Sequence, residues 1–344
     1  MGTVGRCPQD ARSHIDANHD ASGMSASFPR QAEHQFGVFT AQQAAGAGWS
    51  PDQLERAVRA GRLVRLRRAA YADAESAETS HALSRTRLGQ QGVAAALRIP
   101  TATVSHASAI AVHRLPLLET PGRPCVTLPP ALRTRAAALH LHRQPIPVWQ
   151  LDRRSSFALT SVARSCIDLT REAGLAAGLV AADAALHRGL CGVEELAAVY
   201  ATLRGRAGLP SGRRLLELAD GSSESPLETI SRLEMAAWGV SPHTQAELHS
   251  ADGRFLARVD FYWPDLGVVG EADGREKYTD QELWREKRRQ EALTDRGVVL
   301  ARWGWSEARR PALLRATLLR AFHRAGRLRS AGIPANVLCG LNPR

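Results

Sequence analysis

Three acidic residues in the last third of the chain are the strongest candidates for chemistry. Asp260 lies in one β-prone run, and Glu271 and Asp273 lie in the next. Pro264 and Asp265 between the runs are typical of a turn, because proline fixes φ and aspartate tolerates turn geometry. If the loop holds an even number of residues, the hairpin places all three carboxylates on one face, with Asp260 and Glu271 as diagonal neighbours. A loop of odd length would separate them.

Carboxylates clustered in this way predict a divalent metal site. On one sheet face they would repel one another and raise their pKa values, which a bound cation relieves. Oxygen-only ligation suits Mg²⁺ or Mn²⁺, and either ion leaves coordination positions for water and a substrate phosphate. That arrangement is typical of phosphodiester hydrolysis. The competing interpretation is that Asp260 closes a turn, while Glu271 and Asp273 lie on a solvated face and pair with Arg258 and Arg275.

Length and charge narrow the class of protein. The 344 residues are enough for two or three domains. The net charge of +11 comes mostly from arginine, which favours a polyanionic partner such as DNA. No apolar run approaches the roughly 20 residues needed to span a bilayer, so no membrane partner is expected.

The cysteines and the N-terminal residues indicate the compartment. Five scattered cysteines show neither disulfide nor zinc-ribbon spacing, which favours the cytoplasm: Cys7, Cys125, Cys166, Cys191 and Cys339. Residues 1–30 are polar and lack the apolar core of a signal peptide, so they are predicted to be a disordered tail or an over-long start, with Met24 as the alternative initiator.

Residues 31–75 have the pattern of a winged helix-turn-helix. Thr40 can cap a short helix through Ala47, and Ser50 followed by Pro51 opens a second helix that Gly61 ends. The strand-like, basic run 63–71 follows as a wing would. The alternative is a small helical domain with a solvated basic face. Six arginines are the candidate DNA-binding residues: Arg56, Arg59, Arg62, Arg65, Arg67 and Arg68.

The segment GVFTAQQAAGAGWSPDQLERAVRAGRLVRLRRAAYA resembles the N-terminal winged helix of type IV abortive-infection antitoxins. The resemblance covers about residues 34–75. It implies binding to operator DNA, repression of the protein's own genes, and either a cognate toxin or a second copy of the chain, as a homodimer, for a partner.

Residues 80–220 mix Ala- and Leu-rich helical stretches with short β-like runs. The pieces SHASAIAVHRLPL and LTSVARSCIDLTREAG resemble the middle region of the same antitoxin-like proteins. His140 and His142 share a strand face and could bind a metal, but the sequence places no third ligand nearby, so a structural role is expected. His106 and Asp168 are expected to be packing or capping residues, although His106 lies beside serines and could face a ligand.

The last hundred residues alternate helix and strand. Helical spacing begins after Ser225, the hairpin follows, and a helix that Gly297 ends leads to a strand at 298–303 and a helix at about 311–322. The order helix, strand, strand, helix, strand, helix predicts an α/β sandwich. Residues 275–329 carry fifteen Lys or Arg against seven Asp or Glu, which suits a nucleic-acid cleft.

Three pieces in order, SPLETISRL, RVDFYWPDLGVVGEADGREKY and WREKRRQEALTDRGVVLARWGW, resemble the PD-(D/E)XK nuclease fold. The family they resemble comprises domains similar to very-short-patch-repair endonucleases. The resemblance spans about residues 222–325. It implies that Asp260 and Glu271 are metal ligands and that Glu228 is a supporting acid, although Glu228 also has the spacing of a capping box with Ser225.

The same resemblance places Asp273 where these nucleases usually carry a lysine. A lysine would orient water or stabilise the transition state, and an aspartate cannot donate in that way. Lys277 or Lys287 is the candidate for supplying the missing positive charge.

The sequence therefore predicts an α+β multidomain protein. Its parts are a tail (1–30), a winged helix-turn-helix (31–75), a mixed α/β middle region (80–220), a restriction-endonuclease-like α/β/α domain with a mixed sheet (222–329) and a second tail (330–344). The leading hypothesis is a DNA-binding protein with a Mg²⁺-dependent endonuclease domain, in phage defence or a toxin–antitoxin system. The alternatives are an antitoxin-like repressor with a degenerate nuclease fold, and a DNA repair endonuclease.

Overall fold

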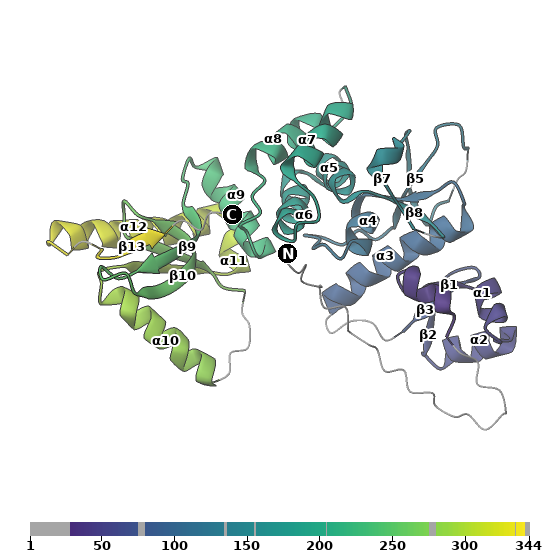
Figure 1. Cartoon of the computed structure of the whole chain (residues 1–344), viewed down its shortest axis with the longest axis horizontal. Helices are drawn as coiled ribbons and strands as arrows, with labels where there is room; N and C mark the ends of the chain where they lie inside the picture. Colours follow the sequence, from purple (N-terminus) through teal and green to yellow (C-terminus); the bar gives the residue numbers. More distant parts are fainter. Residues whose placement is uncertain are drawn as a thin grey trace, which may run out of the picture.

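The structure is a computed structural model. It describes residues 28–74, 80–133, 136–154, 156–203, 205–274, 280–333 and 335–340. Three units follow one another along the long axis of the molecule, with the N-terminal unit at one end and the C-terminal unit at the other (Figure 1). Nearly all of the predicted tail 1–30, and Lys277, lie outside the described residues.

The N-terminal unit is a small sheet carrying short helices. Its elements are η1 (Arg30–His34), β1 (Val38–Thr40), α1 (Ala41–Gly46), α2 (Pro51–Arg59), β2 (Leu63–Arg67) and β3 (Ala70–Asp73), with antiparallel strand order β1-β3-β2. Both helices begin at complete capping boxes, at Thr40 and at Ser50, as their sequence signals predict. The run 63–71 is two strands, joined by a turn in which Ala69 has φ of +57°.

The N-terminal unit is packed on the middle region. Helix α3 (Ser80–Arg98) lies against β1 and β2. Val38 and Ala70 from the small sheet share one apolar cluster with Val93, Val104 and Leu159. The two parts therefore have a common core along α3.

The middle region joins a sheet to a helical layer. The sheet has the order β6-β5-β4-β8-β7, from β4 (Thr103–Val104), β5 (Cys125–Leu128), β6 (His140–Arg143), β7 (Leu151–Arg153) and β8 (Ala158–Thr160). The helices are α4 (His106–Val112), α5 (Val162–Ala173), α6 (Leu175–His187), α7 (Val193–Thr202) and α8 (Leu209–Leu218), and η2 (Val148–Gln150) precedes β7. Leucines and alanines of α4 to α8 form much of one apolar core in the described part of the chain.

The C-terminal unit is a mixed five-stranded sheet between helices. Its elements are α9 (Pro226–Ala237), β9 (His243–His249), β10 (Phe255–Trp263), β11 (Val268–Ala272), α10 (Asp280–Thr294), β12 (Val299–Trp303), α11 (Trp305–Ala308), α12 (Pro311–Ser330) and β13 (Leu338–Gly340). The strand order is β12-β11-β10-β9-β13, and only β11 and β12 pair in parallel within the described part. The predicted α/β/α layering with a mixed sheet is present.

Two strands of this sheet were not predicted. Strand β9 alternates buried Ala246 and Leu248 with polar residues, but Gln245 interrupts the pattern. Strand β13 lies in the segment 330–344 that the sequence analysis treated as a tail, and it pairs with β9. An edge strand of three residues has too short a pattern to be recognised from sequence.

The hairpin of β10 and β11 has the even loop that the carboxylate cluster requires. Trp263 faces Val268, so four residues form the loop, and Phe261 faces Gly270. Asp260 and Glu271 lie one step beyond this last pair, at the point where the alternation of β10 breaks. The loop is therefore even, and the diagonal placement of Asp260 and Glu271 stays a prediction.

The helices cover both faces of the sheet. Helices α9, α11 and α12 pack on the face that carries Phe261 and Trp303, and Leu293 of α10 packs on the face that carries Val259 and Val269. In Figure 1, α10 accordingly projects from the side of the sheet away from α12. None of the helices described here is both long enough and apolar enough to cross a bilayer.

Candidate functional site

The carboxylates predicted from the sequence converge beside the hairpin. Asp260, within β10, accepts a hydrogen bond at Oδ2 from the Ala272 N–H at 2.8 Å. Glu228, on the first turn of α9, is buried and accepts at Oε2 from Gln245 Nε2 at 2.8 Å. The β9–β10 register places Gln245 opposite Asp260. Together with Glu271, three carboxylates and one amide meet at this end of the sheet.

These carboxylates are close enough to perturb one another. Burial, together with the neighbouring charges of Glu228 and Glu271, raises the pKa of Asp260 from 3.8 to about 7, against the opposing Ala272 hydrogen bond and the charge of Arg289. The site therefore destabilises the ionised form of Asp260. A cation placed among the carboxylates would reverse that effect.

Asp260 sits where the regular alternation of β10 breaks. Val259 and Tyr262 pack on one face of the sheet, whereas Phe261 and Trp263 pack on the other. Opposite this break, Gln245 has φ of +51°, a conformation that costs about 1–3 kcal/mol for a residue other than glycine. The strained backbone of Gln245 therefore lies beside the carboxylates.

The structure contradicts most of the competing interpretation. Asp260 is within a strand and does not close a turn, and the Glu271 side chain is only 14% exposed. Arg258 pairs with Glu224, while Arg289 Nη1 of α10 donates to Glu271 Oε1 at 3.1 Å. Arg275 lies outside the described residues.

Arg289 is a cation that contacts the site among the described residues, and sequence reasoning missed it. It is one of many basic residues on α10, so composition alone did not single it out. Lys287, the sequence candidate, is exposed, and its ammonium lies 5.5 Å from the centre of the exposed Trp284 ring. Asp273 follows the end of β11, and its N–H donates to Trp303 O at 2.9 Å, so the ladder with β12 continues through it.

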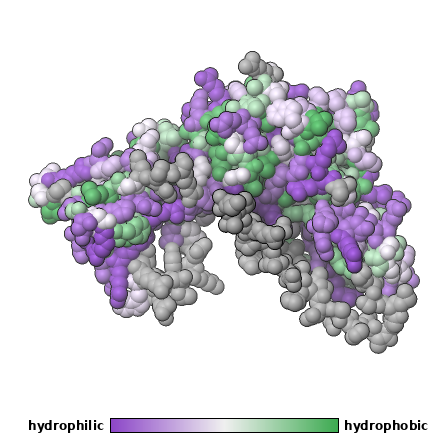
Figure 2. Space-filling view, viewed as in Figure 1, coloured by the Kyte–Doolittle hydropathy of each residue, from purple (hydrophilic) through white to green (hydrophobic). Residues whose placement is uncertain are grey.

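The N-terminal arginines are mostly exposed. Those at the surface are Arg56, Arg59, Arg62, Arg65 and Arg68, and Arg67 is half-buried with its pKa lowered by burial. Arg65 forms an ion pair with Glu55 and lies 5.7 Å from the Tyr71 ring centre. The other four exposed arginines lie on α2 and around the hairpin. The surface of this unit, at the lower right of Figure 2, is largely hydrophilic.

The expectation that His140 and His142 lack a third ligand was wrong. Glu172, near the end of α5, lies 2.7 Å from His140 Nδ1 and 3.6 Å from His142 Nε2. Cys125 completes a group of four potential ligands. These residues are distant in sequence, so only the fold brings them together.

Comparison with known proteins identifies a family for one segment of the chain and two relatives of similar sequence. Residues 30–72 match the family described as "Transcriptional regulator, AbiEi antitoxin". Two Mycobacterium tuberculosis proteins, "Uncharacterized protein MT2308" and "Uncharacterized protein Rv2248", are each 31% identical over 201 residues, which is 58% of this chain and 73% of theirs. The chain belongs to the family of these mycobacterial proteins.

One solved structure matches part of the chain. The crystal structure of the RV2827C protein from Mycobacterium tuberculosis matches 60% of this chain and 81% of its own length, at 19% identity and a TM-score of 0.32. A score this low does not establish a common fold.

The match to the regulator family defines the N-terminal unit. Residues 30–72 form an AbiEi antitoxin-like transcriptional-regulator domain, which contains η1 to β3 almost completely. All six candidate DNA-binding arginines lie inside it. DNA or a toxin is the partner that this family suggests.

Proposed function

We propose that this protein binds DNA through its AbiEi-like domain and hydrolyses phosphodiester bonds in DNA with its C-terminal unit, using Mg²⁺ or Mn²⁺. The observation that carries the proposal is the convergence of Asp260, Glu271 and Glu228 beside one strained strand pair. We further propose that the activity serves defence against foreign DNA or a toxin–antitoxin system.

The order of elements in the N-terminal unit supports the DNA-binding part. Helix, strand, helix, helix, strand, strand is the order expected for a winged helix, with α2 as the recognition helix and the β2–β3 hairpin as the wing. Arg56 and Arg59 lie on the exposed side of α2, where they can contact phosphates or base edges.

The order of elements in the C-terminal unit supports the hydrolytic part. Helix α9, strands β10 and β11, helix α10, strand β12 and helix α12 follow the predicted order helix, strand, strand, helix, strand, helix, with the unpredicted β9 before the hairpin. The carboxylates lie on the central strands β10 and β11 and on the helix that precedes the sheet. Hydrophilic residues cover the exposed side of α10, coloured purple at the lower left of Figure 2.

The donor set fits a hard divalent cation. Asp260 and Glu271 would hold the ion, with Glu228 in support, and all of these donors are oxygen atoms. When bound, such an ion activates water and stabilises negative charge on phosphate oxygens. Arg289, held at Glu271, would add positive charge beside the substrate phosphate, in place of the usual lysine.

The test is DNA cleavage by the purified full chain with Mg²⁺, with Mn²⁺ and with a chelator, on supercoiled, linear and mismatched DNA. Asp260→Ala should abolish metal-dependent cleavage. Asp265→Ala is the matched control, because Asp265 is an exposed carboxylate in the turn of the same hairpin. Wild-type protein that binds DNA but does not cleave it with either metal would refute the hydrolytic part.

A second function has its own support. The match of residues 30–72 to a regulator family, together with Asp273 at the usual lysine position, favours an antitoxin-like repressor in which the C-terminal unit only binds DNA or a partner. Metal-independent binding to the protein's own promoter, without cleavage, would favour this function. Preferential cleavage of mismatched DNA would instead favour repair.

A further inference from the structure

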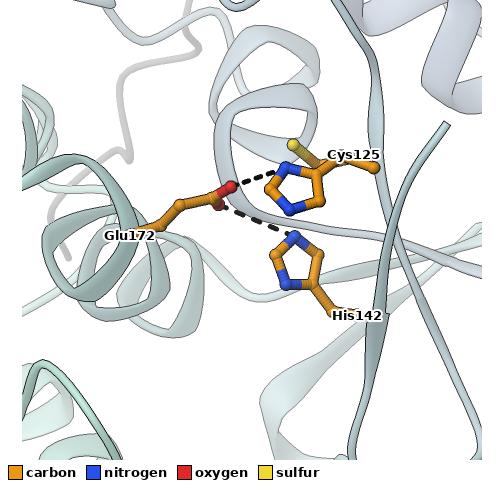
Figure 3. A group of neighbouring side chains, drawn as sticks. Cys125, His142 and Glu172 are labelled. Atoms are coloured by element: carbon orange, nitrogen blue, oxygen red, sulfur yellow. Dashed lines mark ion pairs between the residues drawn. The ribbon is translucent and has the colours of Figure 1, made fainter.

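Four side chains with metal-binding atoms meet in the middle region, far from the carboxylate site. Cys125 begins β5, His140 and His142 lie on β6, and Glu172 lies on the last turn of α5. One potential ligand atom from each residue lies within 4.8 Å of the other three. Figure 3 shows the Glu172 carboxylate reaching from its helix toward Cys125 and His142 on the sheet.

Strand register explains why these residues meet. Strands β5 and β6 are parallel, and Cys125 pairs with His140, so their side chains project from the same face. His142 is two residues further along and shares that face. Strand β6 is at the edge of its sheet, and the His140 side chain is 43% exposed, which leaves an entry path from solvent.

The His142 side chain is not satisfied by the protein alone. His142 Nε2 is buried and makes no hydrogen bond, and at 3.6 Å from Glu172 it is beyond hydrogen-bond distance. A buried polar nitrogen without a partner costs about 1–3 kcal/mol. The nitrogen faces a carboxylate, and a metal ion between the two would satisfy both.

A third histidine, His106, packs against the ring of His142. The His106 ring stacks on the His142 ring with centroids 3.5 Å apart and planes 12° apart. His106 Nδ1 lies 3.0 Å from the Ser105 hydroxyl, which also accepts from Thr127. His106 has φ of +51°, a strained conformation at the residue that positions His142.

We propose that Cys125, His140, His142 and Glu172 bind one Zn²⁺ ion. A set of one thiolate, two imidazoles and one carboxylate suits a borderline-soft divalent ion and not Mg²⁺. Tetrahedral zinc with bonds of about 2.0–2.3 Å requires ligand atoms about 3.3–3.8 Å apart. The 2.7 Å contact between Glu172 and His140 must therefore open slightly, and the wider separations must close.

Four protein ligands fill a tetrahedral site, so the ion is structural. It would tie the edge strand β6 and its neighbour β5 to the end of α5, joining sheet and helical layer. When Zn²⁺ binds, the Cys125 thiol releases its proton to solvent. The ion also gives His142 Nε2 the partner that it lacks in the protein alone. His106 is a positioning residue and not a ligand.

The test measures metal in the full-length protein, purified without chelator and dialysed. Elemental analysis should find about one zinc per chain. His142→Ala should weaken zinc binding by about 100-fold or more, since even the loss of an outer partner costs about 10- to 100-fold. His323→Ala, an exposed histidine on α12, is the matched control and should retain zinc.

Two further measurements separate the outcomes. Co²⁺ substitution should give a thiolate-to-cobalt charge-transfer band that Cys125→Ser removes without loss of the circular dichroism spectrum. Asp260→Ala should keep its zinc, which distinguishes this site from the carboxylate site whether or not the protein cleaves DNA. Dialysed protein without zinc and unable to take it up, or zinc lost from Asp260→Ala but kept by His142→Ala, would overturn the proposal.

Discussion

Replacing Asp260 with asparagine should stabilise the metal-free protein at alkaline pH. Burial and two neighbouring carboxylates raise the pKa of Asp260 from 3.8 to about 7. A shift of about three units corresponds to about 4 kcal/mol at most, at about 1.4 kcal/mol per unit. Asparagine has almost the same shape, carries no charge, and can still accept the Ala272 hydrogen bond.

The direction of the pH dependence follows from the raised pKa. The folded protein binds the Asp260 proton more tightly than the unfolded chain does. The stability that Asp260 contributes is therefore complete below about pH 4 and is lost as pH rises through about 7. The stability difference between Asp260→Asn and wild type should grow by about 1.4 kcal/mol per pH unit across that window and then level off.

The assay is denaturant unfolding of both proteins in chelator, across this pH range, followed by a signal from the C-terminal tryptophans. Asp265→Asn, in the exposed turn, should show no such trend. Adding Mg²⁺ should then stabilise wild type by about 2.7 kcal/mol at a hundredfold excess over Kd, and should leave Asp260→Asn unchanged. If the asparagine variant is no more stable than wild type above pH 7, the ionised Asp260 carboxylate is not destabilised by burial and by its neighbours. That result would refute the argument for a metal site here.

Three further predictions concern charged residues. Arg56→Ala combined with Arg59→Ala should reduce the slope of log K against log salt for DNA binding by about 2, at about 0.9 per phosphate contact. An unchanged slope would exclude α2 as the helix that contacts DNA. Arg289→Ala should slow metal-dependent cleavage about 100-fold while Lys287→Ala does not, and equal rates would remove Arg289 from the site. Arg164→Met removes the partner 2.6 Å from the fully buried Asp168 carboxylate and leaves it with Arg171 at 3.1 Å, so urea unfolding should show a loss of about 1–3 kcal/mol; an unchanged free energy of unfolding would contradict this.

The helix caps and the hairpin were predictable because they depend on neighbours in the chain. Ser50 and Gln53 form their capping box across three residues, and the turn between Trp263 and Val268 is recognisable from Pro264. The mixed sheet of the C-terminal unit was predicted from the order of helical and strand-like segments along the chain. Strand β9 was missed because the left-handed Gln245 breaks its alternation, which no composition signal reveals.

The choice between Lys287 and Arg289 shows where sequence reasoning stops. Residues two apart on an α-helix point about 200° apart, so only one of them can face the sheet. The phase of α10 is set by its packing through Leu293, and it turns Arg289 toward Glu271. Basic composition identified the helix but not the residue.

The sequence by itself determined the capped helices and basic residues of the N-terminal unit and the two carboxylates of the hairpin, because these depend on spacings of a few residues. Tertiary structure alone decided which distant groups meet. It placed Glu228 and Gln245 beside Asp260, and it brought Glu172 to histidines about thirty residues earlier in the chain. The physical reason is that strand register and helix docking set these distances, and both follow from packing of the whole core.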